Sequence, residues 1–134
     1  MHKAILMMLL AIVNSSAMAE WTEVSSNDDF TIYADLAIMS REDNRVKMWL
    51  LDDYRIPQMD DILGLYMSVK EQDELDCKKA LLRILYLSFH HENMGRGEEI
   101  GIDETLGEWI PVIHETIGEA LWKVACGMQA TTLK

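Results

Sequence analysis

The stretch from residue 28 to residue 54, DDFTIYADLAIMSREDNRVKMWLLDDY, predicts that the fold is built on an antiparallel sheet. Its first part carries an apolar side chain at every second position, which is the period of a half-buried strand. The apolar positions that share this face are Phe30, Ile32, Ala34, Leu36 and Ile38. We therefore expect residues 28–40 to form one strand.

The second part of the stretch predicts a strand that returns beside the first. The polar residues REDN, 41–44, supply a turn, and RVKMWLLDDY, 45–54, then alternates again. Its inner face is expected to carry Val46, Met48 and Leu50, and its other face Lys47, Trp49 and Leu51. Two alternating segments joined by a short polar turn indicate a hairpin.

The following segments predict further strands. We expect YRIPQMDD, 54–61, to be a loop, because Pro57 cannot donate a hydrogen bond to a strand ladder. ILGLYMSVKEQ, 62–72, alternates and predicts a strand. CKKALLRILYLSFHH, 77–91, is apolar on both faces; its leucines also fit a helical stripe, but we favour a central strand. The glycine-rich acidic segment 92–109 predicts a connection with one short extended piece.

A helix is predicted close to the C-terminal end. Thr116 and Glu119 form the pattern T-x-x-E of a capping box, in which side chains satisfy free N–H groups at the start of a helix. Gly127 stands where a left-handed residue would end the helix. The apolar stripe between these two signals consists of Ile117, Ala120, Leu121 and Val124. Strands followed by one amphipathic helix indicate an α+β fold.

The first 19 residues predict export from the cytoplasm. Lys3 precedes an uncharged apolar run, residues 4–13, and the segment ends in Ala17-Met18-Ala19. This order is that of a secretory signal peptide cleaved after Ala19, and the run is too short to span a membrane. We expect a signal peptide at 1–19, one domain at 20–134, and no lipoprotein anchor, because no cysteine lies near the cleavage point. The exported protein would be periplasmic or secreted.

The chain contains two cysteines, Cys77 and Cys126. In an oxidising compartment they have one internal pairing available, and a bridge would join the predicted helix to the sheet. A redox dithiol or a metal pair would favour a C-x-x-C motif or additional ligands at short spacing. The export signal therefore favours a structural disulfide.

Composition and motifs point away from nucleic acids and from catalysis. The net charge is −11, whereas phosphate contacts need clustered lysines and arginines, and anionic membrane surfaces would repel the chain. Adjacent strand residues such as His90 and His91 face opposite ways, so they cannot chelate one ion, and we expect them at a strand end in solvent. We expect a non-enzymatic protein with no catalytic residue, metal or cofactor.

The acidic residues are interpreted as solvated. Asp52-Asp53 and Asp60-Asp61 flank the predicted proline loop without the spacing of a calcium loop. A second acidic group lies in the segment 92–109 and could face a basic partner, although a solvated loop is the favoured reading. Its members are Glu98, Glu99, Asp103, Glu104 and Glu108.

Several features, taken in order, resemble the surface-adhesin protein E family of Gram-negative bacteria. They are Trp21, Tyr33 and Asp35, then VKMWLLDDY, SVKEQDELDC, EWIPV and a helix that ends in VAC. The resemblance covers residues 21–126. It implies an antiparallel sheet of about six strands, with a C-terminal helix tethered by the disulfide to the concave side of the sheet. It also implies protein partners, namely host laminin, vitronectin or plasminogen.

The resemblance leads to a functional expectation and to candidate contact residues. We expect a cell-envelope protein-binding domain, with a periplasmic structural or stress-related module lacking a host ligand as the alternative. The candidate partner contacts are Lys70, Lys78, Lys79, Trp49 and Trp122. We expect the two tryptophans to pack on each other beneath the helix, with an exposed aromatic contact patch as the second reading.

Overall fold

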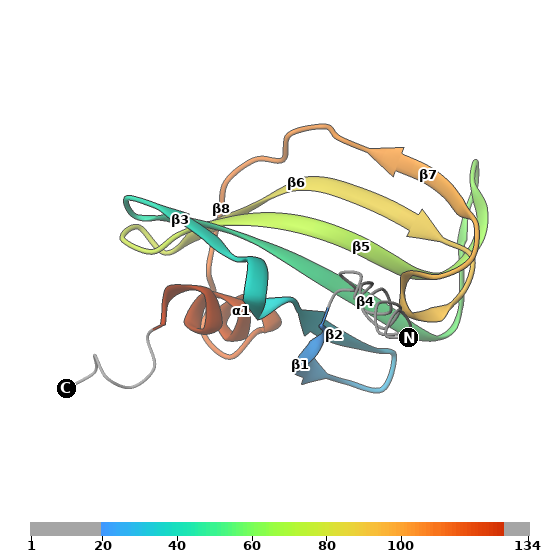
Figure 1. Cartoon of the computed structure of the whole chain (residues 1–134), viewed down its shortest axis with the longest axis horizontal. Coiled ribbons are helices and arrows are strands. Elements are labelled where there is room, and N and C mark those ends of the chain that lie inside the picture. Colours follow the sequence, from blue (N-terminus) through green and yellow to red (C-terminus); the bar gives the residue numbers. More distant parts are fainter. Residues whose placement is uncertain (1–19, 128–134) are drawn as a thin grey trace, which may run out of the picture.

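The computed structural model of the protein describes residues 20–127, and its longest elements are three neighbouring strands (Figure 1). The predicted signal peptide and residues 128–134 lie outside the described residues. The strands are β1 Thr22–Ser26, β2 Phe30–Ala34, β3 Ser40–Glu42, β4 Arg45–Asp60, β5 Gly64–Asp76, β6 Leu81–His90, β7 Glu99–Asp103 and β8 Ile110–Pro111. The helices are two short 3-10 turns, η2 Leu36–Ile38 and η3 Asn93–Gly95, and the α-helix α1 Ile117–Cys126. Among these described elements, no helix has the length and apolar character that spanning a membrane requires.

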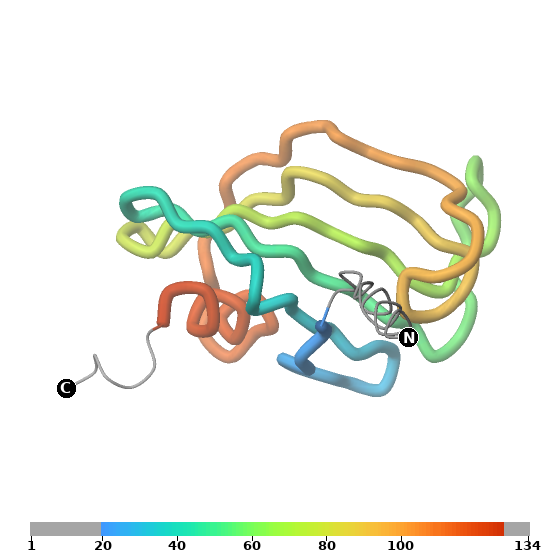
Figure 2. Tube along the Cα trace, viewed as in Figure 1, coloured from blue at the N-terminus to red at the C-terminus, as the bar shows by residue number. Residues whose placement is uncertain are grey.

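All strands belong to one antiparallel sheet in the order β1-β2-β4-β5-β6-β7. This six-strand path and the α+β class confirm the expected fold. Two short strands lie off the path, β3 beside β4 and β8 beside β6. In Figures 1 and 2 the β3–β4 hairpin and the β5–β6 turn project from the same end of the sheet, close to α1.

The predicted hairpin is present, but its first strand is shorter than expected. β2 pairs with β4 from Phe30↔Tyr54 to Ala34↔Leu50. Asp35 then accepts a hydrogen bond from the backbone N–H of Ala37 and caps the turn η2, so extended structure resumes only at β3. A short acidic side chain that bonds to its own backbone competes with the strand ladder, and this local bond ends β2.

The predicted loop at 54–61 is wrong, because β4 continues to Asp60. The β4–β5 register jumps between Asp53 and Gln58, which marks an irregularity in the ladder. Pro57 lies within this interruption, where its missing N–H deprives no ladder position of a donor. β5 is also longer than expected and runs through the acidic segment to Asp76.

The two remaining sequence interpretations of strands hold. The segment read as a central strand rather than a helix contains β6, although Cys77 lies in the turn before this strand. The short extended piece expected within 92–109 is β7. A residue with positive φ, Met94, lies in the turn between β6 and β7.

The core lies between α1 and one face of the sheet, which we call the helix face. Its buried side chains are Ile32, Ala34, Val46, Met48, Leu50, Leu75, Leu82, Leu121 and Ala125. The predicted inner-face residues of β4 belong to this set. Leu51, predicted for the opposite face, is also fully buried there, beneath the turn η3.

The helix α1 begins and ends as predicted. The hydroxyl of Thr116 accepts a hydrogen bond from the backbone N–H of Glu119, and the Glu119 carboxylate accepts one from the backbone N–H of Glu115. Gly127 ends the helix in the left-handed conformation, with φ 62°. The disulfide Cys77–Cys126 joins the C-terminal end of α1 to the β5–β6 turn, which confirms the predicted bridge.

Candidate functional site

The predicted contact residues fall into three separate places. Lys78 and Lys79 are exposed in the β5–β6 turn, where their backbone N–H groups donate to the Asp76 carboxylate. Trp122 packs against the core beneath α1. Trp49 lies on β4 between the core residues Met48 and Leu50, so it points to the opposite, helix-free face. The expected packing of the two tryptophans on each other is therefore wrong.

Trp49 and Lys70 meet in a hollow on the helix-free face, which we call the central hollow. Its volume is about 270 Å³. The indole of Trp49 and the ring of Tyr86 form one side, edge to face with centroids 5.4 Å apart. The complete lining consists of Trp21, Asp35, Ile38, Trp49, Lys70, Tyr86, Ser88, His90 and Glu99.

The strand registers explain why these side chains gather. Trp49 on β4 is opposite Gln72 on β5, which is opposite Tyr86 on β6. Two residues along β5, Lys70 is opposite Ser88 and points to the same face. An aromatic pair, a lysine and a hydroxyl thus lie together on three adjacent strands, in a half-buried setting suited to recognising a polypeptide.

His90 lines the central hollow, whereas it was expected at a strand end in solvent. It is 6% exposed, and its Nε2 lies 2.8 Å from the hydroxyl of Ser88, so the expectation of a solvent-exposed strand end holds for His91 alone. Its Nδ1 makes no hydrogen bond within residues 20–127. Burial lowers the pKa of His90, as does the nearby charge of Lys70, while Glu99 acts in the opposite direction. His90 therefore favours its neutral form at the floor of the hollow.

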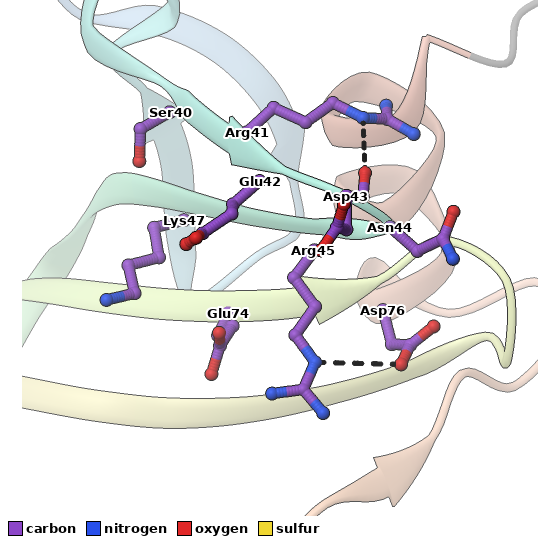
Figure 3. A pocket seen from close by; sticks show the side chains of 9 residues that line it. All are labelled: Ser40, Arg41, Glu42, Asp43, Asn44, Arg45, Lys47, Glu74 and Asp76. Atoms are coloured by element: carbon purple, nitrogen blue, oxygen red, sulfur yellow. Dashed lines mark hydrogen bonds and ion pairs between the residues drawn. The ribbon is translucent and has the colours of Figure 1, made fainter.

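A second, polar hollow lies beside the β3–β4 hairpin and is shown in Figure 3. Its volume is about 630 Å³. Arg45 Nε lies 3.9 Å from Asp76 Oδ2, and Arg41 Nε donates to the carbonyl of Asp43 across the hairpin. Charges of both signs alternate along its walls (Figure 3), so it offers no single charge preference to a ligand.

Two arginines at this polar hollow, Arg45 within its lining and Arg83 beside it, are already engaged. The guanidinium groups of Arg45 and Arg83 lie 5.1 Å and 4.3 Å from the ring centroid of Trp109. Arg83 also bonds to the buried carboxylate of Glu74, with Nη2 2.7 Å from Oε1. These contacts tie the 104–109 segment to the sheet and serve the fold.

The helix face carries a third depression, which we call the acid cleft. Asp52 on β4 and Glu71 and Asp73 on β5 line its floor. Its volume is about 320 Å³, and its remaining lining is apolar except for Thr116. The prediction that Asp52 belongs to a solvated loop is wrong, because β4 continues past this residue and carries it onto the helix face.

The acids of this cleft have raised pKa values. Burial is the main cause for all three. It raises the pKa of Asp52 to about 9, with further contributions from the charge of Glu71 and a hydrogen bond with it. The pKa of Asp73 is raised to about 6, and that of Glu71 is raised well above its ordinary value. The cluster therefore shares protons at neutral pH.

The acids of the connection 92–109 are all exposed, in agreement with the interpretation as a solvated segment. Glu99 differs from the others because it also lines the central hollow. Within residues 20–127, no group of three or more His, Cys, Asp or Glu side chains is arranged to hold a metal ion.

Comparison with known proteins identifies relatives of this fold. The sequence profile described as "Surface-adhesin protein E" matches residues 21–127. A structure of Haemophilus influenzae protein E is similar with a TM-score of 0.64 at 12% identity, covering 85% of this chain and 89% of that chain. Protein E from non-typeable Haemophilus influenzae matches with a TM-score of 0.64 at 13% identity, covering 85% and 80%. None of the curated proteins is similar enough in sequence to match. At these identities the structural likeness establishes the shared fold.

Proposed function

Because the chain belongs to the surface-adhesin protein E family, we propose that it is a non-enzymatic protein-binding domain of the cell envelope. The family assignment supports an exported adhesin that works through protein contacts. The scaffold suits this role, because a disulfide and a long-stranded sheet hold side chains in fixed positions on an exposed face.

The central hollow is the observation that carries this proposal. Trp49 and Tyr86 present a half-buried aromatic pair, and Lys70 adds a positive charge beside it. A few side chains, most often tryptophan, tyrosine and arginine, contribute most of the binding free energy at protein–protein interfaces. Two of the five residues predicted as partner contacts thus lie together on one surface.

The partner class follows from the family resemblance. We propose host laminin, vitronectin or plasminogen as the ligands to be screened, with the exposed Lys78 and Lys79 as a second contact at the end of the sheet. The alternative is a periplasmic module that contacts only other envelope proteins. The two proposals differ in where the domain is located.

Protease shaving of intact producing cells separates the two. We expect added protease to cut this protein while a periplasmic control protein stays intact, and the purified protein to bind at least one of the three host proteins. Protection until the outer membrane is opened would contradict a surface location and favour the periplasmic alternative. Absence of binding to all three proteins would reject the host ligands named here.

A further inference from the structure

The acid cleft contains a buried acid, Asp73, that has no basic group beside it among the described residues. Asp73 is 2% exposed, and its Oδ1 has no hydrogen-bond partner within residues 20–127. The side chain that hydrogen-bonds to its carboxyl is another acid, Glu71. Asp52 Oδ1 likewise has no hydrogen-bond partner within residues 20–127, although the Asp52 carboxyl is also hydrogen-bonded to Glu71. Burying a charge without a partner is strongly unfavourable, and folds avoid it by pairing or neutralising the group.

The adjacent residue on β5, Glu74, is also a buried acid, but it has a cationic partner. Glu74 is 7% exposed, on the opposite face of β5, and the Arg83 guanidinium pairs with it at 2.7 Å. Asp76 has backbone N–H donors from Lys78 and Lys79 as well as Arg45 nearby. For Asp73, the influences on the pKa besides burial are the carboxyls of Glu71 and Asp52, and none is a basic group. The acids of the cleft are therefore neutralised by the protons that they share, and a cation that entered the cleft would take the place of these protons.

The walls of the cleft define what kind of cation fits. Phe30 and Ile32 of β2, Ile84 of β6, and Val112 and Ile117 near the start of α1 surround the acids with apolar surface. Ile84 and Ile113 are 36% and 57% exposed, so the cleft opens to solvent on the side of the 110–117 segment. A hydrated metal ion gains nothing from such walls, whereas an aliphatic stem ending in a positive charge is complementary to both parts.

Aromatic rings at the edge of the cleft strengthen this complementarity. Phe30, Tyr54, Tyr66 and Phe89 form a continuous row with successive centroid distances of 5.3, 6.1 and 5.0 Å. Phe30 lines the cleft. Burial raises the pKa of Tyr54, and the nearby charges of Asp52 and Glu71 add to the rise. Ring faces attract cations, and Phe30 places one end of this row in the wall of the cleft.

We propose that the acid cleft is a binding site for a basic side chain, lysine or arginine, of a protein partner. The aliphatic stem lies between β2, β6 and the 110–117 segment, and the ammonium or guanidinium group pairs with Asp73 and Glu71. The cleft lies on the opposite face of the sheet from the central hollow, so this contact is distinct from the proposed function and does not depend on it.

Binding is expected to displace protons that the cluster holds when the cleft is empty. The groups that face one another are Asp52, Glu71, Asp73 and the Tyr54 hydroxyl, and the cation favours the ionised form of each carboxyl. Affinity for a basic side chain should therefore rise with pH through the range in which the cluster ionises.

The test uses the peptide acetyl-Val-Lys-Val-amide as the probe and amide chemical shifts of the protein as the readout. We expect shift changes confined to residues around Asp52, Asp73 and Ile84, stronger at pH 8.5 than at pH 6. The same peptide with Nε-acetyl-lysine has the stem but no charge, and we expect its affinity to be weaker by about tenfold or more. Calcium is also titrated into the complex of protein and peptide, to test whether a metal ion competes for the cleft.

Isosteric neutral variants decide between a binding site and a structural cluster. We expect Asp73→Asn and Glu71→Gln to weaken peptide binding by about tenfold while the folded protein becomes no less stable, because like-charge repulsion is relieved. Glu104→Gln makes the same charge change at an exposed acid and should leave binding unchanged.

The proposal would be overturned if Asp73→Asn and Glu71→Gln bound the peptide as tightly as the unmodified protein does. It would also be overturned if Glu104→Gln lost as much peptide affinity as the cleft variants, because that result would indicate general attraction to an acidic surface. If calcium displaced the peptide from the cleft, the proposed site for a basic side chain would be rejected in favour of a metal site. Failure to find any host protein partner would reject the proposed function but would leave these peptide results standing.

Discussion

The indole Nε1 of Trp122 donates a hydrogen bond of 3.1 Å to the backbone carbonyl of Asp76, immediately before Cys77. The disulfide from Cys77 to Cys126 lies one helical turn further along α1. The end of α1 is thus joined to the β5–β6 turn twice, by a covalent bond and by a side chain within the core. Lys78 and Lys79 follow directly, so these connections also fix the position of that exposed basic turn.

Reduction of the disulfide should destabilise the protein clearly. The cysteines are 49 residues apart, and loop-closure entropy for this separation gives a stabilisation on the order of 4 kcal/mol. We expect dithiothreitol to lower the melting temperature by roughly 10 °C or more. The double variant Cys77→Ala/Cys126→Ala should reproduce the decrease and be insensitive to the reagent; an unchanged melting temperature on reduction would contradict a stabilising bridge.

Stability should fall as the pH rises above about 4. The pKa of Asp52 is raised from 3.8 to about 9 in the folded protein, so the folded state retains a proton that the unfolded chain releases. This contribution is fully present below pH 3.8 and is lost as the pH rises through about 9; Asp73 adds the same sign up to about 6. Melting temperatures measured from pH 4 to pH 9 should decrease, less steeply in Asp52→Asn. An equally steep decrease in that variant would reject the assignment to Asp52.

Removal of the helix cap should have a moderate effect. Thr116 accepts the backbone N–H of Glu119 at the start of α1, so Thr116→Ala is expected to destabilise the protein by about 1 kcal/mol in chemical unfolding. Thr116→Ser retains the hydroxyl and should lie within a few tenths of 1 kcal/mol of the unmodified protein. Equal effects of both substitutions would show that the hydroxyl does not act as the cap.

Two glycines should respond to alanine in opposite ways. A Cβ at Gly107 would lie 2.9 Å from the backbone carbonyl oxygen of Ile84, which the N–H of Gly107 also contacts. We expect Gly107→Ala to destabilise the protein by about 1–3 kcal/mol, because backbone atoms cannot yield as a side chain does. Gly118 lies in α1 with room for a Cβ, so Gly118→Ala should stabilise by up to about 1 kcal/mol. The two unfolding curves should shift in opposite directions.

The periodic parts of the fold could be predicted because local pattern and tertiary structure agree. The β2–β4 pairing follows alternation, and α1 follows its capping box and terminal glycine. The prediction failed at 54–61 because Pro57 normally excludes a ladder, and here a register shift accommodates it. The acid cleft was missed because KEQDELD has the composition of a solvated segment. One signal was available: Glu71 and Asp73 occupy alternate positions between Val69 and Leu75, which places all four on one buried face.

The most direct test of the account is partner binding by variants of the central hollow, measured by surface plasmon resonance against laminin, vitronectin and plasminogen. We expect Trp49→Ala to weaken the bound ligand's affinity by about 2 kcal/mol, and Lys70→Glu to weaken it as well. Lys123→Glu makes the same charge change on the outer side of α1 and should bind normally. A different result would contradict the central hollow as the contact surface: unchanged affinity in Trp49→Ala and Lys70→Glu, together with loss of binding in Lys78→Glu/Lys79→Glu. That result would assign the contact to the β5–β6 turn.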